Sequence, residues 1–177
     1  MEHAADPDMV RDARRGDEAA FSSLLRPLLE PAYRLAAGML QDRQLAEDAV
    51  QEAALKAWRK MHQLREGTEM RPWFFAIVAN ECRTTRRSRW WSVLKVDAER
   101  GSPEAPQDQA VRSIDLRNAL KRLRSEQRLV IVLYFYLDLP LEEIATITNV
   151  SLAAARGRLY RGIRELKTDF PISEART

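Results

Sequence analysis

The chain has 177 residues, of which 45% are hydrophobic and 31% charged, a balance typical of a folded globular protein and not of a disordered one. Its 29 Lys and Arg barely outnumber its 26 Asp and Glu, so the net charge of +3 points to no particular partner. The single cysteine, Cys82, excludes an intramolecular disulfide and a cysteine-based metal site, and two histidines argue against a zinc site or a histidine-dependent catalytic pair.

Neither the first residues nor the apolar runs of the chain predict export or membrane insertion. Residues 1–6 lack the basic start and the apolar stretch of a secretory signal peptide. The longest apolar run, 129–136, is too short to span a bilayer. We therefore predict a cytoplasmic protein that does not insert into membranes.

The first half of the chain has the apolar spacing of a helical bundle. With 6 glycines and no alternating apolar pattern, the sequence favours an all-α fold. Apolar residues at helical spacing predict helices over the ranges 8–15, 17–39, 43–64 and 71–89. Within the second of these, Pro27 and Pro31 are expected to kink or restart the helix.

Charged side chains are unevenly distributed along these helices. Asp48, Gln51 and Glu52 share the polar face of the predicted helix 43–64, which suits a basic partner. Basic residues cluster at 83–89 and again at 156–167, which indicates two separate contacts with a polyanion. Solvated helix surfaces remain the alternative explanation for all of these patches.

A change of composition divides the chain. Residues 96–110 contain Gly101, Pro103, Pro106 and several acids but few apolar residues, which predicts a flexible acidic linker. We therefore expect two small helical domains, one over 1–95 and one over 111–177.

The second domain begins with apolar positions that predict a helix near 114–123 and another after it. Ser125 is expected to cap the second of these, and its apolar run 129–137 is expected to be fully buried. The following segment has the layout of a helix-turn-helix, with helices over 141–148 and 151–169. Asn149 suits a left-handed turn residue, and Ser151 suits the N-cap of the last helix.

The last helix carries a cationic stripe opposite its apolar side. The stripe and its flank consist of Arg156, Gly157, Arg158, Tyr160, Arg161 and Arg164. Arginine donates two hydrogen bonds to guanine or neutralises phosphate, and a helix after a tight turn is the element that enters the major groove. An ordinary helical hairpin with a solvated basic face is the alternative.

Several of these segments resemble a known family. Leu139–Ala145, Asn149–Ser151 and Arg156–Arg161 resemble region 4 of extracytoplasmic-function sigma factors of RNA polymerase. A second set of segments resembles region 2 of the same family: Gly16–Phe21, Ala46–Glu52, Lys56–Trp58 and Pro72–Asn80. The chain departs from the family pattern at Ala54, Asn149, Ala154, Ala155 and Gly157, which leaves the promoter sequence open but not the family.

The resemblance implies a mechanism and a set of partners. Asp48, Gln51 and Glu52 would dock on the β′ clamp helices of core RNA polymerase, and region 4 would contact the β flap. The cationic stripe would read the minus-thirty-five element of promoter DNA. The melted minus-ten strand would be held by Arg65, Thr68, Glu69, Arg71, Asn80, Arg83, Arg86 and Arg87. An anti-sigma factor is an expected partner, no cofactor is expected, and the chain is not expected to be an enzyme.

Two other protein classes fit parts of the sequence. A sigma-like decoy would sequester a regulator without binding DNA, but Arg156 and Arg161 favour DNA contact. A dimeric helix-turn-helix repressor would explain the second domain and leave the motifs of the first unused.

Overall fold

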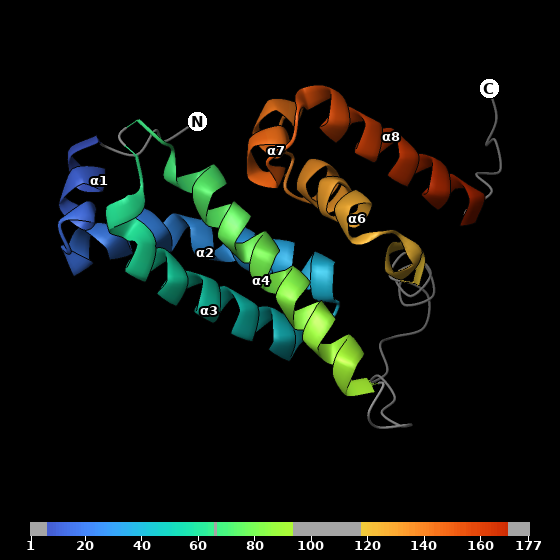
Figure 1. The fold of residues 1–177 in the computed structure, drawn as a ribbon, viewed down its shortest axis with the longest axis horizontal. Helices are drawn as coiled ribbons and strands as arrows, with labels where there is room; N and C mark the ends of the chain where they lie inside the picture. Colours follow the sequence, from blue (N-terminus) through green and yellow to red (C-terminus); the bar gives the residue numbers. More distant parts are fainter. Residues whose placement is uncertain (1–6, 66, 94–117, 170–177) are drawn as a thin grey trace.

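The structure, a computed structural model, describes residues 7–65, 67–93 and 118–169. Every regular element in these ranges is helical, which confirms the predicted all-α class. The ribbon shows α1 to α4 on one side and α6 to α8 on the other (Figure 1). The predicted linker, 96–110, lies entirely outside the described residues. None of the helices in these ranges has an apolar stretch of the length that a bilayer span needs.

The first unit consists of α1 (Pro7–Arg14), α2 (Glu18–Leu40), α3 (Arg43–Lys60) and α4 (Met70–Val93), with the short turn η1 (Met61–Gln63) before the loop to α4. Side-chain caps fix where the helices begin. The carboxylate of Asp17 accepts the Ala20 N–H at 2.9 Å, and that of Asp42 accepts the Leu45 N–H at 3.1 Å. Such caps satisfy backbone donors that the first helical turn leaves unpaired.

The predicted restart of α2 at its prolines is wrong. The helix runs without interruption from Glu18 to Leu40, although Pro27 and Pro31 both lie inside it. The two prolines are four residues apart and therefore share one face, on which Pro27 is exposed and Pro31 half-buried. Because that face meets water, the carbonyls deprived of a helical N–H can be solvated, and the helix continues.

The core of the first unit is built from large side chains of α2 and α4 against small ones of α3. Phe74, Phe75 and Met39 are fully buried. The buried stripe of α3 is made largely of alanines, which lets its backbone approach α2 and α4 closely. Lys56 of α3 also donates to Glu81 of α4 at 2.6 Å, and this hydrogen bond raises the pKa of Lys56.

The second unit contains α6 (Ser125–Ile131), which continues as the π-helical turn η2 (Val132–Tyr136), followed by α7 (Leu141–Thr148) and α8 (Leu152–Asp169). Residues 118–122 are helical as well. The predicted Ser125 cap is wrong: Arg124 is the N-cap residue, and its N–H donates to the side chain of Gln127 at 3.1 Å.

The expectation that 129–137 is fully buried is also wrong. Leu129 and Leu133 are buried, but Phe135 is 62% exposed and Tyr136 50% exposed. The π turn widens the helix at this point and rotates the following side chains away from the apolar face. The apolar run in the sequence therefore predicted burial for aromatic side chains that lie at the surface.

The two units are in direct contact. α7 packs on α4, and α6 and η2 pack on α2. Buried apolar side chains of both units form one continuous cluster. Gly38 of α2 makes the closest approach, since a Cβ there would lie 2.8 Å from Val132 Cγ1. The sequence predicted two separate modules and did not predict this interface.

Candidate nucleic-acid interface

The helix-turn-helix is built as predicted. Asn149 ends α7 with φ 52°, a left-handed conformation, and the Val150 N–H donates to Ala145 O at 3.0 Å. Ser151 Oγ then accepts the Ala154 N–H at 3.2 Å, which caps α8. These contacts hold the start of α8 in a fixed orientation relative to α7.

The predicted stripe of α8 faces solvent along most of its length. Ala155 and Leu159 are buried against the core, while Arg156, Arg161 and Arg164 are exposed and Tyr160 is 65% exposed. Arg158 and Gly157 are half-buried at its edge. An exposed row of guanidinium groups on one rigid helix can bind phosphates and guanine edges.

Two glycines of α8 have different structural roles. At Gly157 a Cβ would lie 3.4 Å from Arg161 Nη1, so the Arg161 side chain lies over the backbone of this residue. At Gly162, which is buried, a Cβ would lie 3.0 Å from Ile131 Cγ1, so the absence of a side chain lets α8 pack closely on α6. Gly157, a predicted interface residue, therefore leaves room for the Arg161 side chain. Gly162 allows α8 to pack closely on its neighbour.

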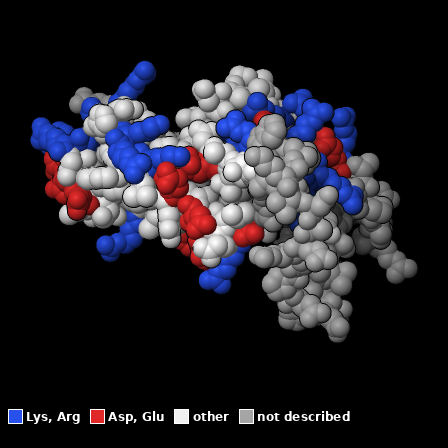
Figure 2. All heavy atoms as spheres, turned by 60° about the horizontal axis from the view of Figure 1, so that its bottom comes forward, with Lys and Arg blue, Asp and Glu red and all other residues white. Residues whose placement is uncertain are grey.

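The predicted docking residues lie together on α3. Asp48 and Gln51 are exposed and Glu52 is half-buried, and Leu55 on the same side is 50% exposed. The face brought forward in Figure 2 carries a band of acidic side chains near its middle. The middle of the outer surface of α3 is thus mixed acidic and apolar, and the exposed Arg43, Arg59 and Lys60 lie toward its ends. The middle suits a basic protein partner with an apolar contact.

The loop before α4 holds the next group of predicted residues. Met61 and Leu64 are buried and anchor its start, and the Thr68 N–H donates to Arg65 O at 3.1 Å to close a turn. Arg65 and Glu69 are exposed and Thr68 is half-buried. Trp73 is half-buried against the core, which favours packing over base stacking for this side chain.

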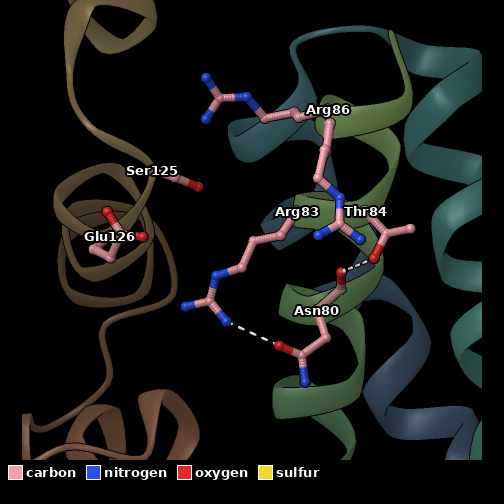
Figure 3. Close-up of a pocket in the computed structure, with 7 residues that line it drawn as sticks. Asn80, Arg83, Thr84, Arg86, Ser125 and Glu126 are labelled. Carbon is pink, nitrogen blue, oxygen red and sulfur yellow. Dashed lines mark hydrogen bonds between the residues drawn. The ribbon is translucent and has the colours of Figure 1, made fainter. Parts of the chain in front are cut away.

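The remaining predicted strand-binding residues line one side of α4. Arg83 Nη1 donates to Asn80 Oδ1 at 2.9 Å, and Arg83 extends toward α6 (Figure 3). Arg86 is half-buried and Arg87 exposed. These side chains line a cavity of about 560 Å³, whose other wall is formed by Ser125 and Glu126 of α6.

Arg71 is separated from this group and faces the second unit. Its Nε donates to Glu143 Oε1 of α7 at 2.7 Å, and its Nη2 donates to the other carboxylate oxygen. The structure therefore places Arg71 in a bidentate ion pair with a residue of the helix-turn-helix, a contact that the sequence did not predict.

Arg128 is a buried charge that sequence reasoning missed. It is 2% exposed and donates to Met39 O of α2 at 3.1 Å and to Lys121 O at 2.7 Å. Burial and then the positive charge of Arg86 lower the pKa of Arg128 to about 10. Backbone carbonyls at helix ends, and not a carboxylate, accept the hydrogen bonds of its guanidinium. The only available signal was an arginine adjoining a long apolar run.

Cys82 is fully buried within α4. Burial raises the pKa of its thiol to about 12, so the group stays protonated and unreactive at neutral pH. This environment agrees with the predicted role of Cys82 as a small apolar core residue.

Comparison with known proteins identifies both units. The family models Sigma-70 region 2 and Sigma-70 region 4 match residues 24–92 and 113–166. The ECF RNA polymerase sigma factor SigL of Mycobacterium tuberculosis is 30% identical over 164 residues, which cover 86% of this chain and 92% of SigL. SigV of Bacillus subtilis is 29% identical over 136 residues, which cover 76% of this chain and 81% of SigV.

Two solved structures have a similar fold. The sigma factor RpoE in complex with the anti-sigma factor NepR from Bartonella quintana superposes with a TM-score of 0.71 and 25% identity, over 86% of this chain and 98% of that one. CnrH in complex with the cytosolic domain of CnrY superposes with a TM-score of 0.72 and 23% identity, over 93% of this chain and 96% of that one.

Proposed function

Because the chain belongs to the extracytoplasmic-function sigma factors, we propose that it binds core RNA polymerase through α3 and directs initiation by contacting promoter DNA with α8 and α4. Residues 1–95 would form the polymerase-docking and minus-ten unit, 96–110 the linker, and 111–177 the minus-thirty-five unit. The protein would work in the cytoplasm, as a subunit of a larger catalyst and not as an enzyme itself.

The observation that supports this most strongly is the exposed arginine stripe of α8. Its helix-turn-helix has the left-handed Asn149 and the Ser151 cap that fix such a helix for groove entry. The Arg161 side chain lies over the backbone of Gly157 on the exposed side of this helix. Contact with base edges would be made by Arg156 and Arg161, and contact with phosphate by Arg158 and Arg164.

The docking proposal rests on α3. Its exposed Asp48 and Gln51 flank the half-buried Glu52, and the exposed Leu55 adds an apolar contact. The β′ clamp helices of the polymerase would supply the complementary basic surface. The β flap would bind region 4, for which the exposed aromatic side chains Phe135 and Tyr136 are suited.

Strand separation would be driven by binding free energy. The loop residues Arg65, Thr68 and Glu69 offer hydrogen-bonding groups for an unstacked base. Arg83, Arg86 and Arg87 would neutralise the phosphates of the melted strand, the term that dominates affinity for nucleic acid. Trapping each unstacked base shifts the equilibrium toward open DNA, so no hydrolytic reaction is required.

We also propose control by an anti-sigma factor. RpoE and CnrH, two similar structures, were solved with NepR and with the cytosolic domain of CnrY. An equivalent partner of this chain would cover α3 and α8, since both present exposed charged faces of opposite sign.

Run-off transcription tests the proposal. Purified chain is added to core polymerase of its source organism on sheared genomic DNA, and transcripts are sequenced at their 5′ ends. We expect a defined set of start sites that is absent with core polymerase alone and is lost with Arg161→Ala. Start sites that do not depend on the chain would exclude the function, and binding of a regulator without DNA binding would identify a decoy.

A further inference from the structure

α3 and α4 pack against each other, and they carry two of the surfaces that the proposed function uses (Figure 1). The outer side of α3 carries the residues proposed to dock on the polymerase, and α4 carries residues proposed to bind the melted strand. The two surfaces keep a fixed relative orientation only if α4 keeps one position on α3.

The apolar contact between these helices does little to fix that position. The buried side chains of α3 are mostly alanines: Ala46, Ala49, Val50, Ala53 and Ala57. Side chains this small form shallow ridges, and the hydrophobic effect has no direction. A neighbouring helix can therefore rotate on this surface while its apolar area stays buried.

Lys56 supplies a directional contact between the same two helices. Its Nζ donates to Glu81 Oε2 of α4 at 2.6 Å, and Glu52 Oε1 of its own helix lies 3.5 Å from the same nitrogen. Among the described residues, this is the one side-chain hydrogen bond that joins α3 to α4. Lys56 thus connects a proposed docking residue with the strand-binding helix.

Glu81 lies on the side of α4 away from the strand-binding arginine. Successive residues of an α-helix are about 100° apart, so Arg83 is about 160° from Glu81 around the helix axis. Arg83 accordingly extends toward α6 and donates to Asn80 Oδ1 at 2.9 Å (Figure 3). A rotation of α4 that broke the pair with Lys56 would turn Asn80 and Arg83 through the same angle.

The pair also compensates an acidic charge on a helix that has to attract phosphate. The Glu81 side chain is only 12% exposed, so its carboxylate has lost most of its water and needs a partner. The hydrogen bond to Glu81 raises the pKa of Lys56, so the amine keeps its positive charge. Without that cation, the carboxylate of Glu81 would repel a DNA strand held by Arg83.

We propose that Lys56 is a positioning residue for the opening of promoter DNA. Through Glu81 it holds α4 in the rotation that presents Arg83 to the melted strand, and through Glu52 it orients a residue of the docking surface. This inference rests on the proposed function. Functional groups have to be held within about 0.5 Å and 10–20° of their working geometry, so a small rotation of α4 is enough to weaken strand capture.

An uncharged pair separates this role from a purely structural one. Replacing an ion pair by apolar residues of similar size is often neutral or stabilising, whereas removal of one partner alone is destabilising. The test variant is therefore Lys56→Met together with Glu81→Met, which leaves no unpaired charge between the helices. We expect an unchanged or higher melting temperature and a Kd for core polymerase within threefold of that of the unmodified chain.

Promoter opening is the measurement on which the proposal depends. Holoenzyme is assembled at saturating concentrations of each variant, on a promoter identified by run-off transcription, and unstacked thymines are detected with permanganate. We expect the thymine reactivity of the uncharged pair to be at least tenfold lower, because α4 no longer has a directional contact with α3. A role limited to stability would lower the melting temperature instead.

Two further variants restore the contact in different ways. Lys56→Arg keeps the charge and the donor, and it should retain at least half of the thymine reactivity. Exchange of the charges, Lys56→Glu with Glu81→Lys, rebuilds an ion pair between the helices in the opposite sense. This exchange should recover at least a third of the reactivity that the uncharged pair loses.

An ion pair within α3 provides the matched control. Arg43 Nε lies 3.0 Å from Glu47 Oε1, four residues further along the same helix. Arg43→Met with Glu47→Met removes the same charges without affecting the contact with α4, and it should leave the melting temperature and the thymine reactivity unchanged.

The possible results separate the proposal from the function on which it rests. Full thymine reactivity in the uncharged pair of Lys56 and Glu81, or an equal loss in the control, would overturn the positioning role. A loss of reactivity that follows a fall in melting temperature would also overturn it. If the unmodified chain itself opens no promoter DNA with core polymerase, the proposed function fails before any variant is compared.

Discussion

Asp48→Arg is the most direct perturbation of the proposed docking face. Asp48 is exposed on α3, and its only hydrogen bond found among the described residues is a long one of 3.3 Å from Gln44 Nε2. Substitution at such a site is expected to change the free energy of unfolding by no more than about 0.5 kcal/mol. The fold and the melting temperature should therefore be preserved.

The expected loss of polymerase affinity is much larger. One pair of unit charges at 4 Å is worth about 1 kcal/mol in water and about 4 kcal/mol near a protein surface. Replacing the carboxylate by a guanidinium turns an attraction into a repulsion of similar size. Because the change is twice the pair energy, we expect a loss of about 2–8 kcal/mol, which weakens the Kd at least about 30-fold.

The assay is titration of labelled protein with core polymerase, followed by fluorescence anisotropy at two salt concentrations. Glu30→Arg is the control, because it makes the same charge change at an exposed position of α2. High salt should reduce the difference between the two variants. Equal affinities, or a melting temperature lowered only in Asp48→Arg, would refute the reasoning.

Three further outcomes follow from the structure. Arg161→Ala should weaken duplex promoter binding by about 1–3 kcal/mol, measured by holoenzyme filter binding; an unchanged affinity would remove Arg161 from the interface. Asn149→Val should lower the free energy of unfolding by about 1–2 kcal/mol in urea denaturation, because a β-branched residue is strained at φ 52°; an unchanged midpoint would contradict the left-handed turn. Cys82 should resist thiol reagents at pH 8 in the folded protein. Its folded pKa of about 12 exceeds the ordinary 9.0, so its contribution to stability is complete below pH 9 and declines as pH rises toward 12, a loss that Cys82→Ala should remove.

Local patterns were sufficient to predict the helices and the helix-turn-helix. The α7 bounds, the left-handed Asn149 and the Ser151 cap depend on residues close together in sequence, whose preferences are strong. The predicted restart of α2 was wrong, because solvent on one side of the helix satisfies the carbonyls freed by Pro27 and Pro31. The burial predicted for Phe135 and Tyr136 from their apolar character was also wrong, because a π turn changes which side of the helix they occupy.

The contact between the two units was beyond sequence reasoning. Gly38 and Val132 are far apart in the chain, and neither belongs to a motif. Glu143 was recognised as part of the first helix of the helix-turn-helix, yet its partner Arg71 was assigned to DNA. Which residues pair across the two units depends on how whole helices pack on each other. The apolar periodicity of a single helix contains no information about that packing.

Permanganate and hydroxyl-radical footprinting of the holoenzyme on one promoter shows where the chain holds and opens the DNA. We expect two protected segments with centres about 25 base pairs apart, and reactive unstacked thymines only in the downstream segment. Arg161→Ala should weaken the upstream protection, and Arg83→Ala should reduce the thymine reactivity. A single protected segment, or two without unstacked thymines, would contradict the claim that one chain holds the promoter at two places and opens it at one.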